Sequence, residues 1–209
     1  MERLVIIGAG GMAREVVSLV DAINAETPKF DLLGALDDGS PNEERWNAIG
    51  VALLGPVSMM KDLDAKFVIA IGDGKVRRKI ARALIDDGCR PATLLHPNLQ
   101  TGRLVRIGAG SVVAGNVSIT TNVTVGDHVF INIGCVIGHD AEISDFVTLM
   151  PRVTVCGETF LEEAATLGVN SVVLQSLRIG ESAFLGAGAV AVRDVAGGTI
   201  AVGVPARSR

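Results

Sequence analysis

A six-residue repeat governs the second half of this 209-residue chain. Counting every sixth residue from Ile107 to Ala191 gives fifteen positions, and fourteen of them are Ile, Val or Leu. The residue two places earlier is small or β-branched almost throughout. An α-helix does not repeat every six residues, whereas two inward residues separated by one outward residue are typical of a short β-strand.

Each repeat therefore predicts a short strand followed by a corner, and three repeats make a triangular coil of eighteen residues. Fifteen repeats give about five coils, which stack by parallel strand pairing around an aliphatic column. The glycine that often follows the aliphatic position, as at Gly138 and Gly168, is interpreted as a turn residue with positive φ. Such a column has little room for rings, which fits the presence of one Trp, six Phe and no Tyr.

The first half has the pattern of a small α/β domain. An apolar run leads into Gly8-Ala9-Gly10-Gly11, and strands and helices then alternate, which predicts a parallel sheet. The expected strands cover residues 3–8, 32–36, 67–71 and 92–95, and the expected helices cover 14–23 and 75–86. We therefore expect a Rossmann-like βαβ domain over 1–97, followed by a parallel β-helix over 98–209.

The glycine-rich turn is a candidate anion site. Backbone N–H groups at a strand–helix junction, together with the helix dipole, can hold a phosphate. A tight turn that binds nothing remains an alternative. A redox dinucleotide site is disfavoured, because the unit is short and the acidic pair Asp37-Asp38 lies nearer thirty than twenty residues beyond the turn.

Composition excludes several classes of protein. A net charge of −4 argues against a nucleic-acid surface, and no apolar run reaches the roughly 18 residues that a membrane span needs. The three cysteines, Cys89, Cys135 and Cys156, lack metal-binding spacing. They predict reduced thiols, a cytoplasmic location and no metal site.

The combination of features resembles a known family. A short α/β domain that opens with GAGG is joined through His96-Pro97-Asn98 to the repeats, which contain the segment Asn132–Asp140 and end in GVPAR. This resembles the bacterial hexapeptide-repeat sugar acetyltransferases, which include nucleotide-linked 4-aminosugar N-acetyltransferases and sialic acid O-acetyltransferases. The resemblance implies a left-handed β-helix, a homotrimer with active sites between subunits, acetyl-CoA as co-substrate and a nucleotide-sugar acceptor.

The resemblance also assigns catalytic roles. His139 corresponds to the general base, Asp140 to a carboxylate that orients it, and Asn132 to a residue that holds the acceptor or the histidine. Transfer to an amine requires removal of a proton, and imidazole can accept it near neutral pH. Thr148 stands where the family often has a second histidine near the acetyl group, so it is expected to contact the substrate.

Stepping by coils extends this assignment. Gly157 lies eighteen residues after His139, and its N–H is expected to stabilise the oxyanion. By resemblance, Val169 and Ala187, in line with Pro151, bind the pantetheine arm of CoA. The remaining implied ligand contacts are Gly8, Gly10 and Gly11 with the nucleotide diphosphate, Asp37 and Asp38 with the ribose or base, and Arg193, Arg207 or Arg209 with the CoA phosphates. We interpret His96 and His128 as structural.

The expected reaction is N-acetylation of the 4-amino group of a nucleotide-linked 4-amino-dideoxysugar, in surface glycan synthesis. Direct attack is expected, because no Cys or Ser has the base partner that a covalent intermediate requires. Two alternatives remain. One is O-acetylation of a free sugar such as sialic acid, and the other is a non-catalytic trimeric scaffold or sensor.

Overall fold

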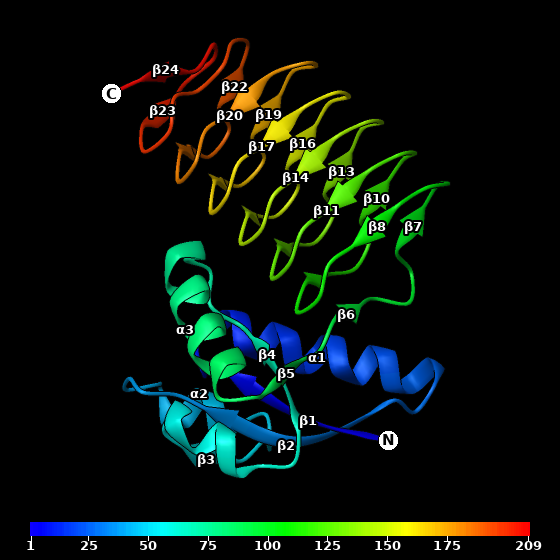
Figure 1. The fold of residues 1–209 in the computed structure, drawn as a ribbon, viewed down its shortest axis with the longest axis vertical. Helices are drawn as coiled ribbons and strands as arrows, with labels where there is room; N and C mark the ends of the chain where they lie inside the picture. The colour runs from blue at the N-terminus through cyan, green and yellow to red at the C-terminus, as the bar shows by residue number, and fades with distance from the viewer.

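The computed structural model describes residues 1–209, which form an α/β domain and a β-helix stacked along the long axis (Figure 1). The α/β domain contains one parallel sheet with the strand order β3-β2-β1-β4-β5. Its elements are β1 Glu2–Ile7, α1 Gly11–Glu26, β2 Phe30–Leu36, α2 Glu43–Asn47, β3 Leu53–Gly55, the 3-10 helix η1 Val57–Asp62, β4 Lys66–Ile69, α3 Gly74–Asp86 and β5 Arg90–Pro91. The predicted alternation is confirmed, with β3, α2 and η1 as additions to it.

Three strands of this sheet end side by side. Ile7 of β1 lies opposite both Leu36 of β2 and Ile69 of β4. The residues that follow these strands therefore meet at one edge, the carboxyl edge. In open parallel sheets, ligands bind at this edge.

The β-helix has three faces built from strands of two or three residues. Face 1 contains β6 Leu94–Leu95, β9 Val112–Val113, β12 Phe130–Ile131, β15 Thr148–Leu149, β18 Thr166–Leu167, β21 Phe184–Leu185, β23 Ile200–Val202 and β24 Arg207–Ser208. Face 2 contains β7 Gln100–Thr101, β10 Ser118–Ile119, β13 Val136–Ile137, β16 Thr154–Val155, β19 Val172–Val173 and β22 Val190–Ala191. Face 3 contains β8 Arg106–Ile107, β11 Thr124–Val125, β14 Glu142–Ile143, β17 Phe160–Leu161 and β20 Arg178–Ile179. From β6 to β22, strands pair in parallel eighteen residues apart, as Val136 does with Thr154, so the predicted coil length is confirmed.

The interior of the β-helix is one column of 27 buried residues without an aromatic ring. Ile137, Val155 and Val173 are fully buried within it. Burying an aliphatic side chain of this size is worth about 1.5–3 kcal/mol relative to leaving it exposed. The repeated aliphatic position therefore holds successive coils together.

The corners correct the expectation about glycine. Gly138 and Gly168 do not have positive φ, and the left-handed residues lie two places further on, at Asp140 and Asn170. A Cβ at Gly138 or Gly168 would lie 2.6 Å from a backbone nitrogen of the next coil. Glycine fits here because successive coils approach closely.

The β-helix begins earlier than its sequence predicts. The sequence predicts a strand of the α/β sheet over 92–95, but that sheet ends with β5, and Leu94–Leu95 pairs with Val112–Val113 on face 1. Coil pairing thus begins before residue 98, the expected start of the second domain. The two domains also share a core, in which α1 packs with Leu94, Val112 and Phe130.

The three faces meet different surroundings. The N-terminal domain covers the start of face 1, where Val112, Phe130 and Thr148 are buried (Figure 1). Face 3 exposes charged side chains, including Arg178. Face 2 is uncovered and uncharged at its outward strand positions, half of which are valine, and Val136 among them is 43% exposed.

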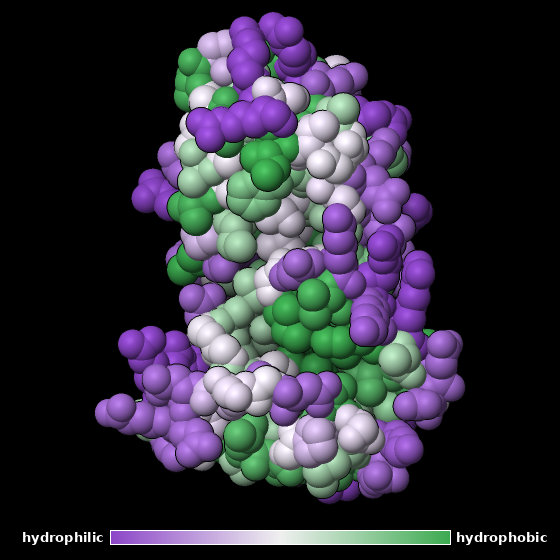
Figure 2. Space-filling view, turned by 90° about the vertical axis from the view of Figure 1, so that its left-hand side faces the viewer, coloured by the Kyte–Doolittle hydropathy of each residue, from purple (hydrophilic) through white to green (hydrophobic).

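Figure 2 shows a further apolar area at the level where the two domains meet, bordered on one side by hydrophilic side chains. No helix in the structure has both the length and the apolar character needed to cross a membrane.

Candidate active site

His139 projects from the corner between faces 2 and 3. Its Nδ1 lies 2.7 Å from Asp140 Oδ2, and the Asn122 amide donates to Asp140 Oδ1 at 2.6 Å. The Asn122 hydrogen bond, followed by that of His139, holds the pKa of the Asp140 carboxyl below its usual range. Because an ionised carboxylate can only accept hydrogen bonds, Nδ1 carries the proton and Nε2 is free to accept another.

The imidazole of His139 lies against Gly157 of the next coil. The Glu158 N–H donates to the His139 carbonyl at 2.8 Å, which fixes the register of these corners. A Cβ on Gly157 would lie 2.6 Å from His139 Cε1 and 2.7 Å from Nε2, so only glycine fits beneath the ring. The Gly157 N–H has no acceptor within the chain. This corner therefore presents a base and an unused hydrogen-bond donor together.

A second group of expected site residues lies on another corner, between faces 1 and 2. Asn132 is 7% exposed, and its Oδ1 accepts the Ile133 N–H at 2.7 Å. Val169 and Ala187 are exposed, and their N–H groups have no acceptor within the chain. Face 2 separates this corner from His139, so a single chain does not bring the two groups together.

A cavity of about 370 Å³ opens beside Asn132. Its lining combines Glu15 and Ser18 of α1 with Asn132 and Pro151 of the β-helix. Glu15 follows Gly11, the first residue of α1, by about one helical turn. The cavity thus lies between the first half of α1 and the Asn132 corner, with polar side chains from both domains.

The glycine-rich turn lies at the carboxyl edge and begins α1. Gly8 has a φ of +102°, and a Cβ there would lie 3.2 Å from the Ala70 carbonyl oxygen. Gly10 is the N-cap residue, so no side chain caps the helix, and Gly11 opens a first turn without acidic residues. The first N–H groups of α1 are therefore available to an anion.

Asp37 and Asp38 stand next to this turn and are partly engaged by the backbone. Asp37 Oδ2 accepts the Ala9 N–H at 2.6 Å, and its Oδ1 accepts the Gly39 N–H at 2.7 Å. Asp38 is exposed, and its Oδ1 accepts the Val57 N–H at 2.8 Å. Asp37 shapes the turn, while Asp38 keeps one oxygen free.

Thr148 does not face an open surface, which corrects the expectation of a substrate contact. Its side chain is fully buried, because its strand position faces the N-terminal domain. The hydroxyl donates to the Gly72 carbonyl at 2.7 Å and accepts from Arg77 Nη1 at 2.9 Å. Thr148 therefore links the two domains.

Sequence reasoning missed Asn122 and Arg77. Asn122 could have been found, because it precedes Asp140 by one coil of eighteen residues. Arg77 carries no comparable signal, since it stands in a helix rich in charges and its partners in the β-helix are distant in sequence. It is nevertheless only 1% exposed.

Of the other two histidines, His128 has the structural surroundings predicted for it, whereas His96 is half-buried and also lines the cavity beside Asn132. His128 is stacked between Phe67 and Phe146, with ring centroids 6.0 and 5.4 Å away, and burial lowers its pKa. His96 Nδ1 accepts the Asn98 N–H at 3.1 Å in the entry to the β-helix.

Arg193, Arg207 and Arg209 are exposed near the C-terminal end. Their contact with the CoA phosphates stays a prediction. The three cysteines are free. No cluster of three or more His, Cys, Asp and Glu side chains could hold a metal ion.

The arrangement of turn, sheet and coils matches known proteins. Residues 3–84 match the model of the PglD N-terminal domain. The GDP-perosamine N-acetyltransferase of Escherichia coli O157:H7 is 30% identical over 175 residues, which cover 82% of this chain and 78% of that protein. The chain belongs to the hexapeptide-repeat sugar acetyltransferase family. It is therefore an acyltransferase.

Solved structures of the family share the whole architecture. PerB from Caulobacter crescentus, in complex with CoA and GDP-perosamine, is similar with a TM-score of 0.89 and 30% identity, over 100% of this chain and 98% of that one. The acetyltransferase domain of PglB from Neisseria gonorrhoeae, in complex with acetyl coenzyme A, has a TM-score of 0.88 and 27% identity, over 100% and 99% of the two chains. The Rossmann-like domain and the left-handed β-helix are thereby confirmed.

Proposed function

We propose that this acyltransferase moves an acetyl group from acetyl-CoA to the 4-amino group of a nucleotide-linked 4-amino-dideoxysugar, in surface glycan synthesis. The observation that carries the proposal is the His139–Asp140 pair lying against Gly157, whose N–H has no acceptor within the chain. The similarity to PerB, which was crystallised with CoA and GDP-perosamine, supports this choice of donor and acceptor class.

The chemistry follows from the atoms at this corner. The amine nitrogen attacks the thioester carbonyl carbon while His139 Nε2 takes a proton from that nitrogen. The Gly157 N–H stabilises the oxyanion of the tetrahedral intermediate. The intermediate collapses with loss of the CoA thiolate, which receives the proton from the imidazolium. Asp140 holds the ring and stabilises its charged form.

The acceptor would span the two domains. Its diphosphate would lie on the N–H groups at Gly10 and Gly11, and Asp38 would meet the ribose or base. The cavity beside Asn132 would take the sugar, because it lies next to the first turns of α1 and carries polar groups from both domains.

A homotrimer would complete the site. His139 and the donors at Val169 and Ala187 lie on different corners of one chain, so a second subunit is needed to bring such groups together. Face 2 and the corners beside it offer apolar contact groups: Val136 on the face is 43% exposed, and Val169 and Leu174 on the corners are 45% and 41% exposed. Exposed apolar patches of this kind mark interfaces. A closed ring of three subunits would bury face 2 of every subunit.

The test is acetyl transfer from acetyl-CoA to UDP-, dTDP- and GDP-linked 4-aminosugars, with free sialic acid as a competing acceptor. The proposal expects transfer to at least one nucleotide aminosugar, and stabilisation of the folded protein by the matching nucleotide. Transfer to sialic acid alone, without nucleotide binding, would replace it with O-acetylation of a free sugar. Failure to bind acetyl-CoA in calorimetry would favour a non-catalytic scaffold.

A further inference from the structure

Arg77 is a buried arginine without a hydrogen-bonded carboxylate partner. It extends from α3 across the domain junction, and burial lowers its pKa to about 10, so it is charged at neutral pH. Its guanidinium donates to His128 O, Ile71 O, Gly72 O, Thr148 Oγ1, Phe146 O and Val147 O, at 2.7–3.0 Å. All three guanidinium nitrogens are thus used in one fixed orientation.

These acceptors belong to two different parts of the molecule. Ile71 and Gly72 lie in the turn after β4, at the carboxyl edge of the α/β sheet. The other four acceptors lie on corners and strands of the β-helix. Thr148 adds a second link, because its hydroxyl donates to Gly72. We name Arg77, Gly72 and Thr148 the latch.

The latch does more than hold the domains together. Apolar contacts between α1 and face 1 already do so, and taking a charge out of water costs several kcal/mol. A planar guanidinium that donates to several acceptors fixes the orientation of the two domains as well as their distance. The arginine is therefore suited to set an orientation.

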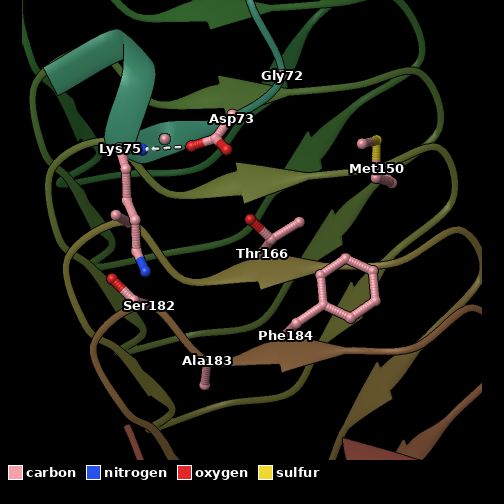
Figure 3. Close-up of a pocket in the computed structure, with 10 residues that line it drawn as sticks. Gly72, Asp73, Lys75, Met150, Thr166, Ser182, Ala183 and Phe184 are labelled. Carbon is pink, nitrogen blue, oxygen red and sulfur yellow. Dashed lines mark hydrogen bonds between the residues drawn. The ribbon is translucent and has the colours of Figure 1, made fainter. Parts of the chain in front are cut away.

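The latch borders a pocket between the domains. This cavity of about 330 Å³ has Gly72, Asp73 and Lys75 on one side and Met150, Thr166 and Phe184 on the other (Figure 3). Gly72 is itself a latch residue, and Met150 follows Thr148 by two positions. A change in the latch would move one wall against the other.

Resting on the proposed function, we propose that Arg77 is a positioning residue for acetyl transfer. Through Gly72 and Thr148 it sets how the nucleotide-binding domain sits on the β-helix, and hence where the acceptor amine lies relative to the thioester. Reaction requires the two atoms to approach to about 3–3.5 Å, and a misplacement of about 1 Å can cost about 100-fold in rate.

The experiment compares Thr148→Val with Thr148→Ser. Valine keeps the shape but removes both hydrogen bonds of the hydroxyl, and serine restores them. We expect Thr148→Val to lower kcat for the nucleotide aminosugar roughly tenfold and Thr148→Ser to stay near wild type. The Kd for the nucleoside diphosphate and for CoA should be unchanged in both variants. Thr124→Val is the matched control, since Thr124 has the same strand position on exposed face 3.

Arg77→Lys provides a second variant, which keeps the charge but loses the planar guanidinium and most of its hydrogen bonds. It should reduce kcat more than Thr148→Val does. If the wild type is active and Thr148→Val is equally active, the proposed positioning role of Arg77 and Thr148 is refuted. So would a loss of kcat that merely follows the unfolded fraction of the variant. Wild-type inactivity with every nucleotide aminosugar would instead overturn the proposed function.

Discussion

Replacing Gly157 by alanine tests the geometry of the His139 corner. The new Cβ would lie 2.6 Å from His139 Cε1 and 2.7 Å from Nε2, whereas unstrained heavy atoms stay about 3.5 Å or more apart. The imidazole must therefore move by about 1 Å. A displacement of this size at a reacting group costs about 100-fold in kcat, or about 2.7 kcal/mol of activation free energy.

Steady-state acetyl transfer measures this loss directly. Thermal stability should change little, because the His139 side chain is 60% exposed and can swing outward. Gln175→Ala is the control, since Gln175 occupies the same corner position one coil further on and should leave kcat unchanged. A Gly157→Ala variant with near wild-type kcat would refute the placement of the base over Gly157.

Three further predictions concern other parts of the account. Asp140→Asn should lower kcat roughly 10- to 100-fold, because the imidazolium loses its carboxylate partner, and an unchanged kcat in steady-state assays would argue against that role. Val136→Glu places a charge on face 2 and should give monomers in sedimentation experiments together with loss of transfer, whereas an active trimer would exclude face 2 as the interface. The free energy of unfolding should fall as pH drops below about 6.5, because the unfolded chain protonates His128 while the buried ring resists it. The slope of this loss is at most about 1.4 kcal/mol per pH unit. Urea titrations at several pH values measure this free energy, and His128→Asn should remove the contribution of His128 to its pH dependence. A variant with the same pH profile as the wild type would contradict this assignment.

Much of the β-helix was predictable because one constraint repeats. Each coil must place an aliphatic residue in the same column, so the phase from Ile107 to Ala191 determines the strands from β8 to β22 and the pairing among them. The same count places Gly157 over His139. The corner backbone was not predictable in this way. Glycine is required at Gly138 because the backbone of the next coil approaches closely, and not because its own φ is positive.

The domain junction was the least predictable part. Arg77 looks like a solvated helix charge in the sequence, and only the folded chain shows its contacts with residues 128 and 146–148. Thr148 was misinterpreted for the same reason, since its burial depends on the N-terminal domain covering face 1. Local patterns carry no information about such distant packing.

The central claim is that His139 acts as the general base of acetyl transfer to a nucleotide aminosugar. The most direct test is kcat/KM for acetyl-CoA and the best aminosugar acceptor with His139→Ala, alongside calorimetric binding of CoA. The account predicts a fall of about 10²- to 10⁴-fold, with CoA affinity unchanged. A His139→Ala enzyme that keeps kcat/KM within a few-fold of wild type would contradict it.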